Sequence, residues 1–166
     1  MGEKIKYAQM HDLLYEQIKG LIRAEERLDY SLDKARLIDF GKKEFSDEEF
    51  EVMEALCSRF ARLADILIQK ILRLIDKIEL EDADLSVIDR IEKAEKRGII
   101  SSACEFKNIR ALRNEIAHEY AEERFCDICR DVAGYIPALK DAVCRVKDYA
   151  ENLRERSFKS DKISGH

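Results

Sequence analysis

A helical repeat of apolar side chains between Phe50 and Ile78 constrains the fold more than any other feature of this sequence. Its members recur every three or four residues over about eight turns, which is the period of a helix and not of a strand. They are Phe50, Met53, Leu56, Phe60, Leu63, Leu67, Ile71, Leu74 and Ile78. Ser46 and Glu49 precede the repeat with the spacing of a capping box, so a long helix is expected to begin there.

The rest of the chain supplies partners for this helix. The expected helical ranges are 4–39, 46–78, 85–97, 102–120 and 122–156. Gly98 is a typical helix stop, and Pro137 should kink or divide the last helix because proline lacks the amide donor. The sequence therefore predicts an all-α protein: an up-and-down antiparallel helical bundle of four to five main helices. Residues 1–156 are expected to form one domain, and residues 157–166 a polar tail.

Composition supports helices and limits the kinds of partner. Hydrophobic residues make up 46%, and there is one proline and six glycines. The net charge of −5 argues against a protein that coats nucleic acid, but an enzyme needs only a local basic cleft. Lysines and arginines of the first helix, Arg23 and Arg27 among them, alternate with acidic residues. We expect a solvated face with ion pairs along the helix there, and not a nucleic-acid stripe.

Cysteine usage and hydropathy indicate a compartment. The chain has five cysteines and no recognisable signal peptide, which is typical of free thiols in a reducing cytosol. No apolar run approaches the roughly 20 residues needed to span a bilayer. We therefore expect a cytoplasmic protein without a membrane segment. Cys126 and Cys129 are read as two small, semi-buried residues in preference to a zinc or redox pair.

The segment 106–120 carries the candidate chemistry. On a helical wheel Arg113 lies inside the apolar arc, with Arg110, Asn114 and His118 on the adjoining flank and Tyr120 on the same stripe. A guanidinium in an apolar arc is costly unless it has partners or reaches a cleft. The cluster is thus a candidate anion or phosphate site. The alternative reading is a snorkelling arginine, a surface histidine and a core tyrosine.

This segment resembles a known family. Arg113-Asn114-Glu115-Ile116-Ala117-His118-Glu119-Tyr120 is similar to the Arg-x4–6-His motif of the HEPN superfamily and to the stricter Arg-x4-His-x-Tyr form of HepT toxins. The resemblance implies a metal-independent RNA endonuclease, the toxin subunit of a HEPN–nucleotidyltransferase toxin–antitoxin pair. It implies no cofactor, a homodimer, tRNA or mRNA as substrate, and a minimal nucleotidyltransferase antitoxin as partner.

The same resemblance assigns roles. His118 would act either as the general base at the ribose 2′-hydroxyl or as the general acid at the leaving oxygen. Arg113 would hold the scissile phosphate. Asn114 would orient the histidine or the phosphate, and Arg110 would support phosphate binding. Tyr120 corresponds to the tyrosine that the antitoxin AMPylates. The competing hypothesis is an inactive HEPN adaptor that only binds its nucleotidyltransferase or a substrate.

Two other sites were weighed for the same histidine. Glu115-x-x-His118 has the spacing of di-iron bundles, but these need two such motifs, and the chain has three histidines in all. A phosphotransfer bundle would also place one histidine on a helix, although the residues that follow His118 do not fit that pattern. We expect no metal site.

Overall fold

The structure, a computed structural model, describes residues 2–79, 85–118 and 122–163. Within these ranges every regular element is a helix and no strand occurs, which confirms the predicted all-α bundle. In chain order the elements are α1 (Gly2–Ala35), α2 (Asp47–Asp65), the π-helical segment η1 (Ile66–Ile71), α3 (Leu72–Ile78), α4 (Val87–Lys96), α5 (Ala103–His118) and α6 (Glu122–Ile163).

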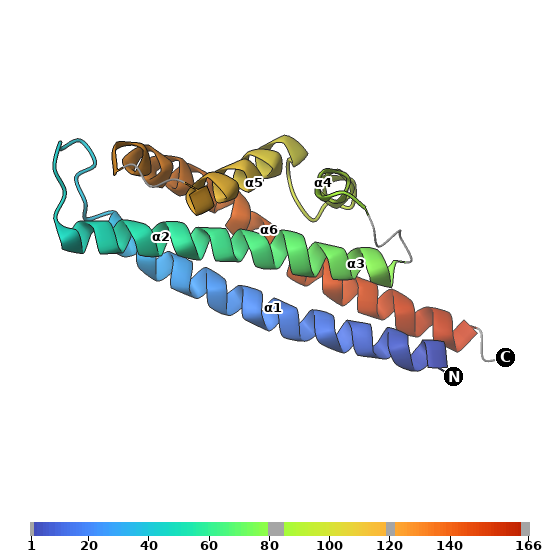
Figure 1. The fold of residues 1–166 in the computed structure, drawn as a ribbon. Coiled ribbons are helices and arrows are strands. Elements are labelled where there is room, and N and C mark those ends of the chain that lie inside the picture. The colour runs from blue at the N-terminus through green and yellow to red at the C-terminus, as the bar shows by residue number, and fades with distance from the viewer. Residues whose placement is uncertain (1, 80–84, 119–121, 164–166) are drawn as a thin grey trace.

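The long helices alternate in direction (Figure 1). α1 runs away from the end that holds both termini, and α2, η1 and α3 return along it as one rod. α5 then runs against that rod, and α6 returns to the end where the chain began. α4 is seen nearly end-on in Figure 1, so it lies across the long helices and joins α3 to α5. The outcome is the up-and-down order that the sequence predicts.

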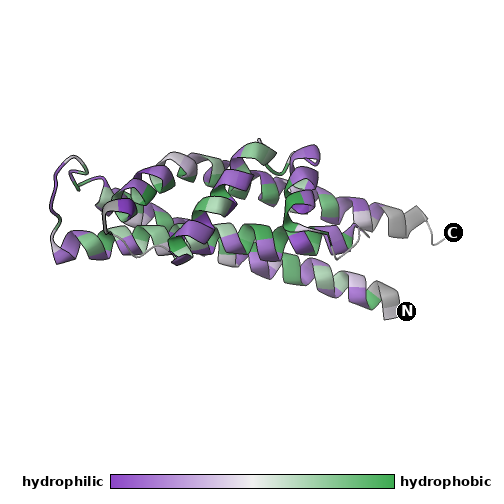
Figure 2. Cartoon of the chain, turned by 45° about the horizontal axis from the view of Figure 1, so that its top comes forward, coloured by the Kyte–Doolittle hydropathy of each residue, from purple (hydrophilic) through white to green (hydrophobic). Residues whose placement is uncertain are grey.

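The apolar repeat from Phe50 to Ile78 forms the centre of the core. All of its members are buried except Phe50, which is half-buried at the start of α2. Ser46 caps α2 as expected, because its hydroxyl accepts from the amide of Glu49 while the Glu49 carboxylate accepts from the amide of Ser46. Hydrophobic and hydrophilic residues alternate around the long helices in Figure 2, as amphipathic packing requires.

α1 covers this rod with its predicted stripe. Leu14, Leu21, Leu28 and Ala35, spaced seven apart, are all buried. The helix ends at Ala35 and not near Asp39, because the chain closes with short turns in which the amide of Ile38 donates to the carbonyl of Ala35. The prediction of the element was correct, and its end was placed four residues too late.

α4 ends in a left-handed turn at Gly98, whose φ is +73°. The amide of Ile99 donates to the carbonyl of Ala94 at 2.9 Å, and the amide of Gly98 donates to the carbonyl of Glu95 at 2.9 Å. These two bonds form a Schellman motif and confirm the predicted stop. The turn leads directly into α5, where Ser102 accepts from the amide of Glu105 at 3.2 Å.

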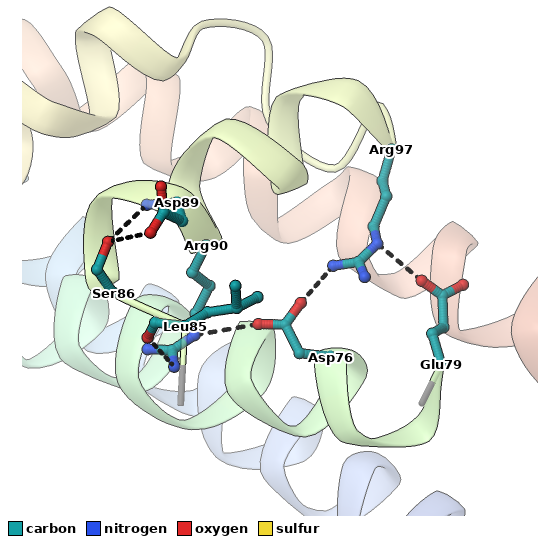
Figure 3. A network of polar contacts seen from close by, with 7 residues as sticks. All are labelled: Asp76, Glu79, Leu85, Ser86, Asp89, Arg90 and Arg97. Carbon is teal, nitrogen blue, oxygen red and sulfur yellow. Dashed lines mark hydrogen bonds and ion pairs between the residues drawn. The ribbon is translucent and has the colours of Figure 1, made fainter. Parts of the chain in front are cut away.

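A buried ion network fixes α4 to the end of the rod (Figure 3). The Asp76 carboxylate, only 1% exposed, accepts from Arg90 Nε at 3.1 Å and from an Nη1 donor of Arg97. Arg97 Nε also lies 2.7 Å from Glu79 Oε2. Burial lowers the pKa of Arg97, but its hydrogen bond to Asp76 and the charge of Glu79 outweigh this and raise its pKa overall.

α6 differs from the prediction at two points. Pro137 does not divide it, since one helix runs from Glu122 to Ile163. The helix also continues through most of the segment expected to be a polar tail. Cys126 and Cys129 are buried in α6, and Cys129 Sγ lies 3.4 Å from Cys57 Sγ of α2, but none of these three described cysteines forms a disulfide. They are packing residues, as expected.

Candidate functional site

A cleft of about 440 Å³ lies between α5 and the junction of α2 with η1. The residues that line it are Ala64, Asp65, Ile68, Gln69, Lys70, Arg110, Arg113 and Asn114. Three of the five residues predicted from sequence, namely Arg110, Arg113 and Asn114, thus face one cleft. Phe106, Ile109 and Leu112 bury the apolar arc of α5, and the three polar residues lie at the edge of that arc and on its adjoining flank, where they reach the cleft.

Asp65 holds Arg113 in place. Arg113 Nε donates to Asp65 Oδ1 at 2.8 Å, and Nη2 donates to Oδ2 at 2.8 Å. This is the bidentate fork of a guanidinium on a carboxylate, which fixes the plane of the group as well as its position. A guanidinium has five N–H donors, so donors of Arg113 that are not directed at Asp65 remain for an anion in the cleft.

The electrostatics of the pair favour a permanent cation. The hydrogen bonds to Asp65 raise the pKa of Arg113 above its ordinary value, so the guanidinium is charged at every pH at which proteins fold. The two side chains are 35% and 39% exposed, and solvent therefore screens them. Such a pair contributes about 1 kcal/mol or less to stability. Its geometry matters more than its energy, because it holds a cation at the rim of a cleft.

The floor of the cleft is built from a π-helix. η1 begins directly after Asp65, and the amide of Leu72 donates to the carbonyl of Leu67, five residues earlier. Each such turn holds one residue more than an α-turn, which widens the helix and rotates the side chains that follow. Gln69 and Lys70, both exposed, reach the cleft from this segment. π-turns occur frequently at functional sites.

His118 lies outside the cleft lining. It is the last residue of α5 and is exposed. Five residues separate it from Arg113, which places it about 7.5 Å further along the helix axis and about 140° around it. The two side chains therefore do not share one face of α5. Tyr120, the predicted site of modification, lies outside the residues that the structure describes.

Glu115 is engaged elsewhere. Its Oε1 accepts from Arg124 Nε of α6 at 2.7 Å, which ties the C-terminal half of α5 to α6. The carboxylate of the Glu115-x-x-His118 pattern is thus an ion-pair partner. In the ranges that the structure describes, no group of three or more His, Cys, Asp or Glu side chains could hold a metal ion.

No protein-family model matches the chain, and no curated protein is significantly similar to it. The functional argument therefore rests on the motif and on the geometry around it. Among the described helices, none combines the length and the apolar character that a bilayer crossing requires.

Sequence reasoning missed two members of this site. Asp65 was not singled out, although an acid within the apolar stretch from Leu63 to Ile68 is a signal that a cation must face it. Lys70 was also missed. It follows Asp65 by five residues, a spacing that would put the two on different faces of an α-helix, and η1 brings both to the cleft.

Proposed function

We propose that this protein is a HEPN-type ribonuclease of the HepT class, which cleaves RNA without a metal ion. The observation that carries the proposal is the gathering of Arg110, Arg113 and Lys70 around one cleft beside the motif helix. Asp65 is the only carboxylate that lines the described cleft, and it orients Arg113. Such a set suits a phosphodiester, because charge that develops on the phosphate oxygens meets fixed donors.

The chemistry follows from the residue types. His118 accepts the proton of the ribose 2′-hydroxyl, whose oxygen attacks the adjacent phosphorus, while Arg113 stabilises the charge on the phosphoryl oxygens. The P–O5′ bond breaks, and the 5′-oxygen receives a proton from an acid or from water. The products are a 2′,3′-cyclic phosphate and a 5′-hydroxyl. Asn114 and Arg110 bind and orient the phosphate from the same helix.

The proposal includes a homodimer. Arg113 and His118 lie on different faces of α5, so one α5 brings only one of them to a given phosphate. Two protomers that pair along the exposed ends of α5 would place the histidine of one near the arginine of the other. A single species of monomer mass at micromolar concentration in analytical ultracentrifugation would contradict this arrangement.

RNA cleavage in EDTA tests the chemistry. Total RNA or a single-stranded oligonucleotide is incubated with the protein, and the 3′ ends are analysed for cyclic phosphate. His118→Ala and Arg113→Ala should each remove the activity, whereas Asn108→Ala, an exposed change on the same helix, should keep it. Activity that EDTA abolishes, or that His118→Ala retains, would contradict the mechanism. An inert wild-type protein would favour the adaptor hypothesis.

The partner follows from the motif. A minimal nucleotidyltransferase would transfer AMP from ATP to the hydroxyl of Tyr120, releasing pyrophosphate, two residues beyond His118 in the sequence. The added phosphate would pair with Arg113 or Arg110 in place of the substrate. Incubation with a nucleotidyltransferase encoded beside this protein, followed by mass mapping, should locate the AMP at Tyr120, and Tyr120→Phe should escape neutralisation. Full neutralisation of Tyr120→Phe would contradict a covalent mechanism.

A further inference from the structure

A second hollow, distinct from the cleft at Arg113, runs between α1 and the rod of α2, η1 and α3. These elements lie side by side along most of their length (Figure 1). The hollow measures about 450 Å³, and we call it the α1–α2 groove. Its cationic lining residues are Arg23, Arg27, Arg59, Arg62 and Lys70. No carboxylate is among its described lining residues, although the whole protein carries a net charge of −5.

Among the described residues, no carboxylate forms an ion pair with a cation of this groove. Lys19 and Arg36 of α1 do pair along the helix, with Glu16 and Asp33 three residues away, as the sequence led us to expect for this face. Arg23 and Arg27 form no such pair with any described residue and turn instead toward the groove. Arg23 and Arg27 are exposed, as expected for a solvated face, but the ion pairs expected along this face do not include these two arginines.

On the rod the cations form a regular file. Arg59, Arg62, Lys70, Arg73 and Lys77 follow one another at helical spacings, with Ile66 filling the remaining position. Arg73 and Lys77 line a smaller hollow that shares Lys70 with the groove. The file covers about 27 Å from end to end. Like charges at these spacings repel one another and destabilise a helix slightly, and a bound polyanion would relieve that repulsion.

Lys70 connects the groove to the candidate site. The same side chain lines the α1–α2 groove, the smaller hollow beside Arg73, and the cleft that contains Arg113. The basic path is therefore continuous with the site proposed for chemistry. A charged polymer that lies along the groove would pass Lys70 and reach Arg113 without crossing a described acidic residue other than Asp65.

We infer that the α1–α2 groove binds the backbone of a single-stranded RNA and leads it past Lys70 to the cleft at Arg113. This inference rests on the proposed function for its choice of polymer. A positively charged groove that follows the backbone, with sites of about 4–16 nucleotides, is the usual basis of sequence-independent single-strand binding. Arg59 has a structural part in the groove, because its Nη1 donates to Ser31 Oγ at 2.6 Å and to the carbonyl of Arg27 at 3.1 Å. The other cations are exposed and available to phosphates.

The experiment measures binding separately from cleavage. The probe is a fluorescent 2′-O-methyl oligouridylate of about 12 nucleotides, which a groove of this kind can hold. It lacks the 2′-hydroxyl nucleophile and stays intact whether or not the protein is a ribonuclease. Fluorescence anisotropy against salt concentration gives both the affinity and the number of phosphates contacted.

Two matched double variants identify the groove. Arg23→Gln/Arg62→Gln removes two groove cations, and Lys19→Gln/Arg36→Gln removes the same charge from the paired face. Loss of two contacts on a single strand should weaken binding about 25-fold at 0.1 M salt and reduce the salt slope by about 1.4. The control pair should bind like the wild type.

Gly20 offers a probe that leaves the fold intact. It lies in α1 on the groove, and a Cβ there would meet no atom within 4 Å. Gly20→Glu places a carboxylate among the cations, and Gly20→Gln places a neutral group of the same size there. Both changes favour the helix. We expect the glutamate variant to weaken RNA binding about fivefold, the equivalent of one phosphate contact at 0.1 M salt, and the glutamine variant to match the wild type.

The outcomes separate this inference from the proposed function. RNA binding that is equal in the groove variants and the wild type would overturn the inference, while cleavage that requires His118 would leave the proposed function standing. RNA binding that weakens in the groove variants, without RNA cleavage by the wild type, would support the inference and overturn the proposed function. If the variants lose affinity for a poly-glutamate peptide but not for the oligonucleotide, the groove serves an acidic protein and the inference is wrong.

Discussion

Removal of the Asp76 carboxylate should destabilise this protein more than any other single change in its ion pairs. Asp76 accepts from Arg90 and Arg97, and Arg90 is itself only 4% exposed. In Asp76→Ala the Arg90 guanidinium keeps one neutral partner, the carbonyl of Leu85 at 3.3 Å. A buried charge left without its counter-ion costs about 3–5 kcal/mol. In a chain of 166 residues this cost lowers Tm by roughly 6–20 °C.

Urea unfolding followed by circular dichroism measures the effect. Asp76→Asn should cost nearly as much as Asp76→Ala, because its amide places N–H donors against a guanidinium that also only donates. Asp89→Asn is the matched control. Asp89 lies in α4, next to Arg90, but it is exposed. Its carboxylate accepts from the Ser86 hydroxyl, which in turn accepts from the Asp89 amide (Figure 3). This change should cost less than about 1 kcal/mol.

A double variant tests the reason for the loss. If the cost comes from an unpaired buried cation, then Asp76→Ala/Arg90→Met should be no less stable than Asp76→Ala alone, since the second change removes that cation. The free energies of the two single changes would then be strongly non-additive. Additive losses, or an Asp76→Ala variant within about 1 kcal/mol of the wild type, would refute the reasoning.

Three further predictions concern other parts of the molecule. Asp65→Asn should lower Tm by about 4 °C or less, because the Asp65–Arg113 pair is exposed. The same change should reduce RNA cleavage roughly 10–100-fold, because Arg113 is then no longer held in position. A loss of stability as large as that expected for Asp76→Ala would contradict the view that Asp65 positions Arg113 and adds little stability. Burial, together with the charge of Arg154, lowers the pKa of His11 below its ordinary value of 6.5. Near this pH the unfolded chain therefore binds more protons at His11 than the folded chain does, and the free energy of unfolding should fall as pH drops below about 6.5. The difference between wild type and His11→Gln in urea unfolding should show this slope, and parallel curves would contradict it. Of the five cysteines, the exposed Cys104 and Cys144 should react quickly with a thiol reagent, and the other three should react only on unfolding. A third thiol that reacts quickly would indicate an open interface between α2 and α6.

The fold was predictable where local signals dominate. The repeat from Phe50 to Ile78, the Ser46 cap and the Gly98 stop each depend on a few neighbouring residues, and all three hold. The helix is not divided at Pro137, because the burial of Ile136 and Leu139 within α6 offsets the missing hydrogen bond. The weak local preference gave way to tertiary packing, as it usually does.

The site was predictable only in part. The position of Arg113 within an apolar arc indicated a partner or a cleft, and the structure provides both. The identity of the partner could not be read from the chain, because Asp65 lies 48 residues away and the fold alone brings the two together. The basic file from Arg59 to Lys77 was not recognised from the sequence, although its spacing can be read there, and Arg23 and Arg27 join it only when α1 packs beside the rod.

The π-helical segment η1 gives this chain an unusual tolerance of length changes. A residue deleted from a buried helix normally rotates everything beyond it by about 100° and ruins the packing. Within Ile66–Ile71 the helix already holds surplus residues, so a one-residue deletion can be absorbed by a return to α-helical winding. The core beyond the segment would keep its register, and only the approach of Lys70 to Asp65 would be lost. Natural variants that lack one residue here would therefore fold normally and differ at the cleft alone.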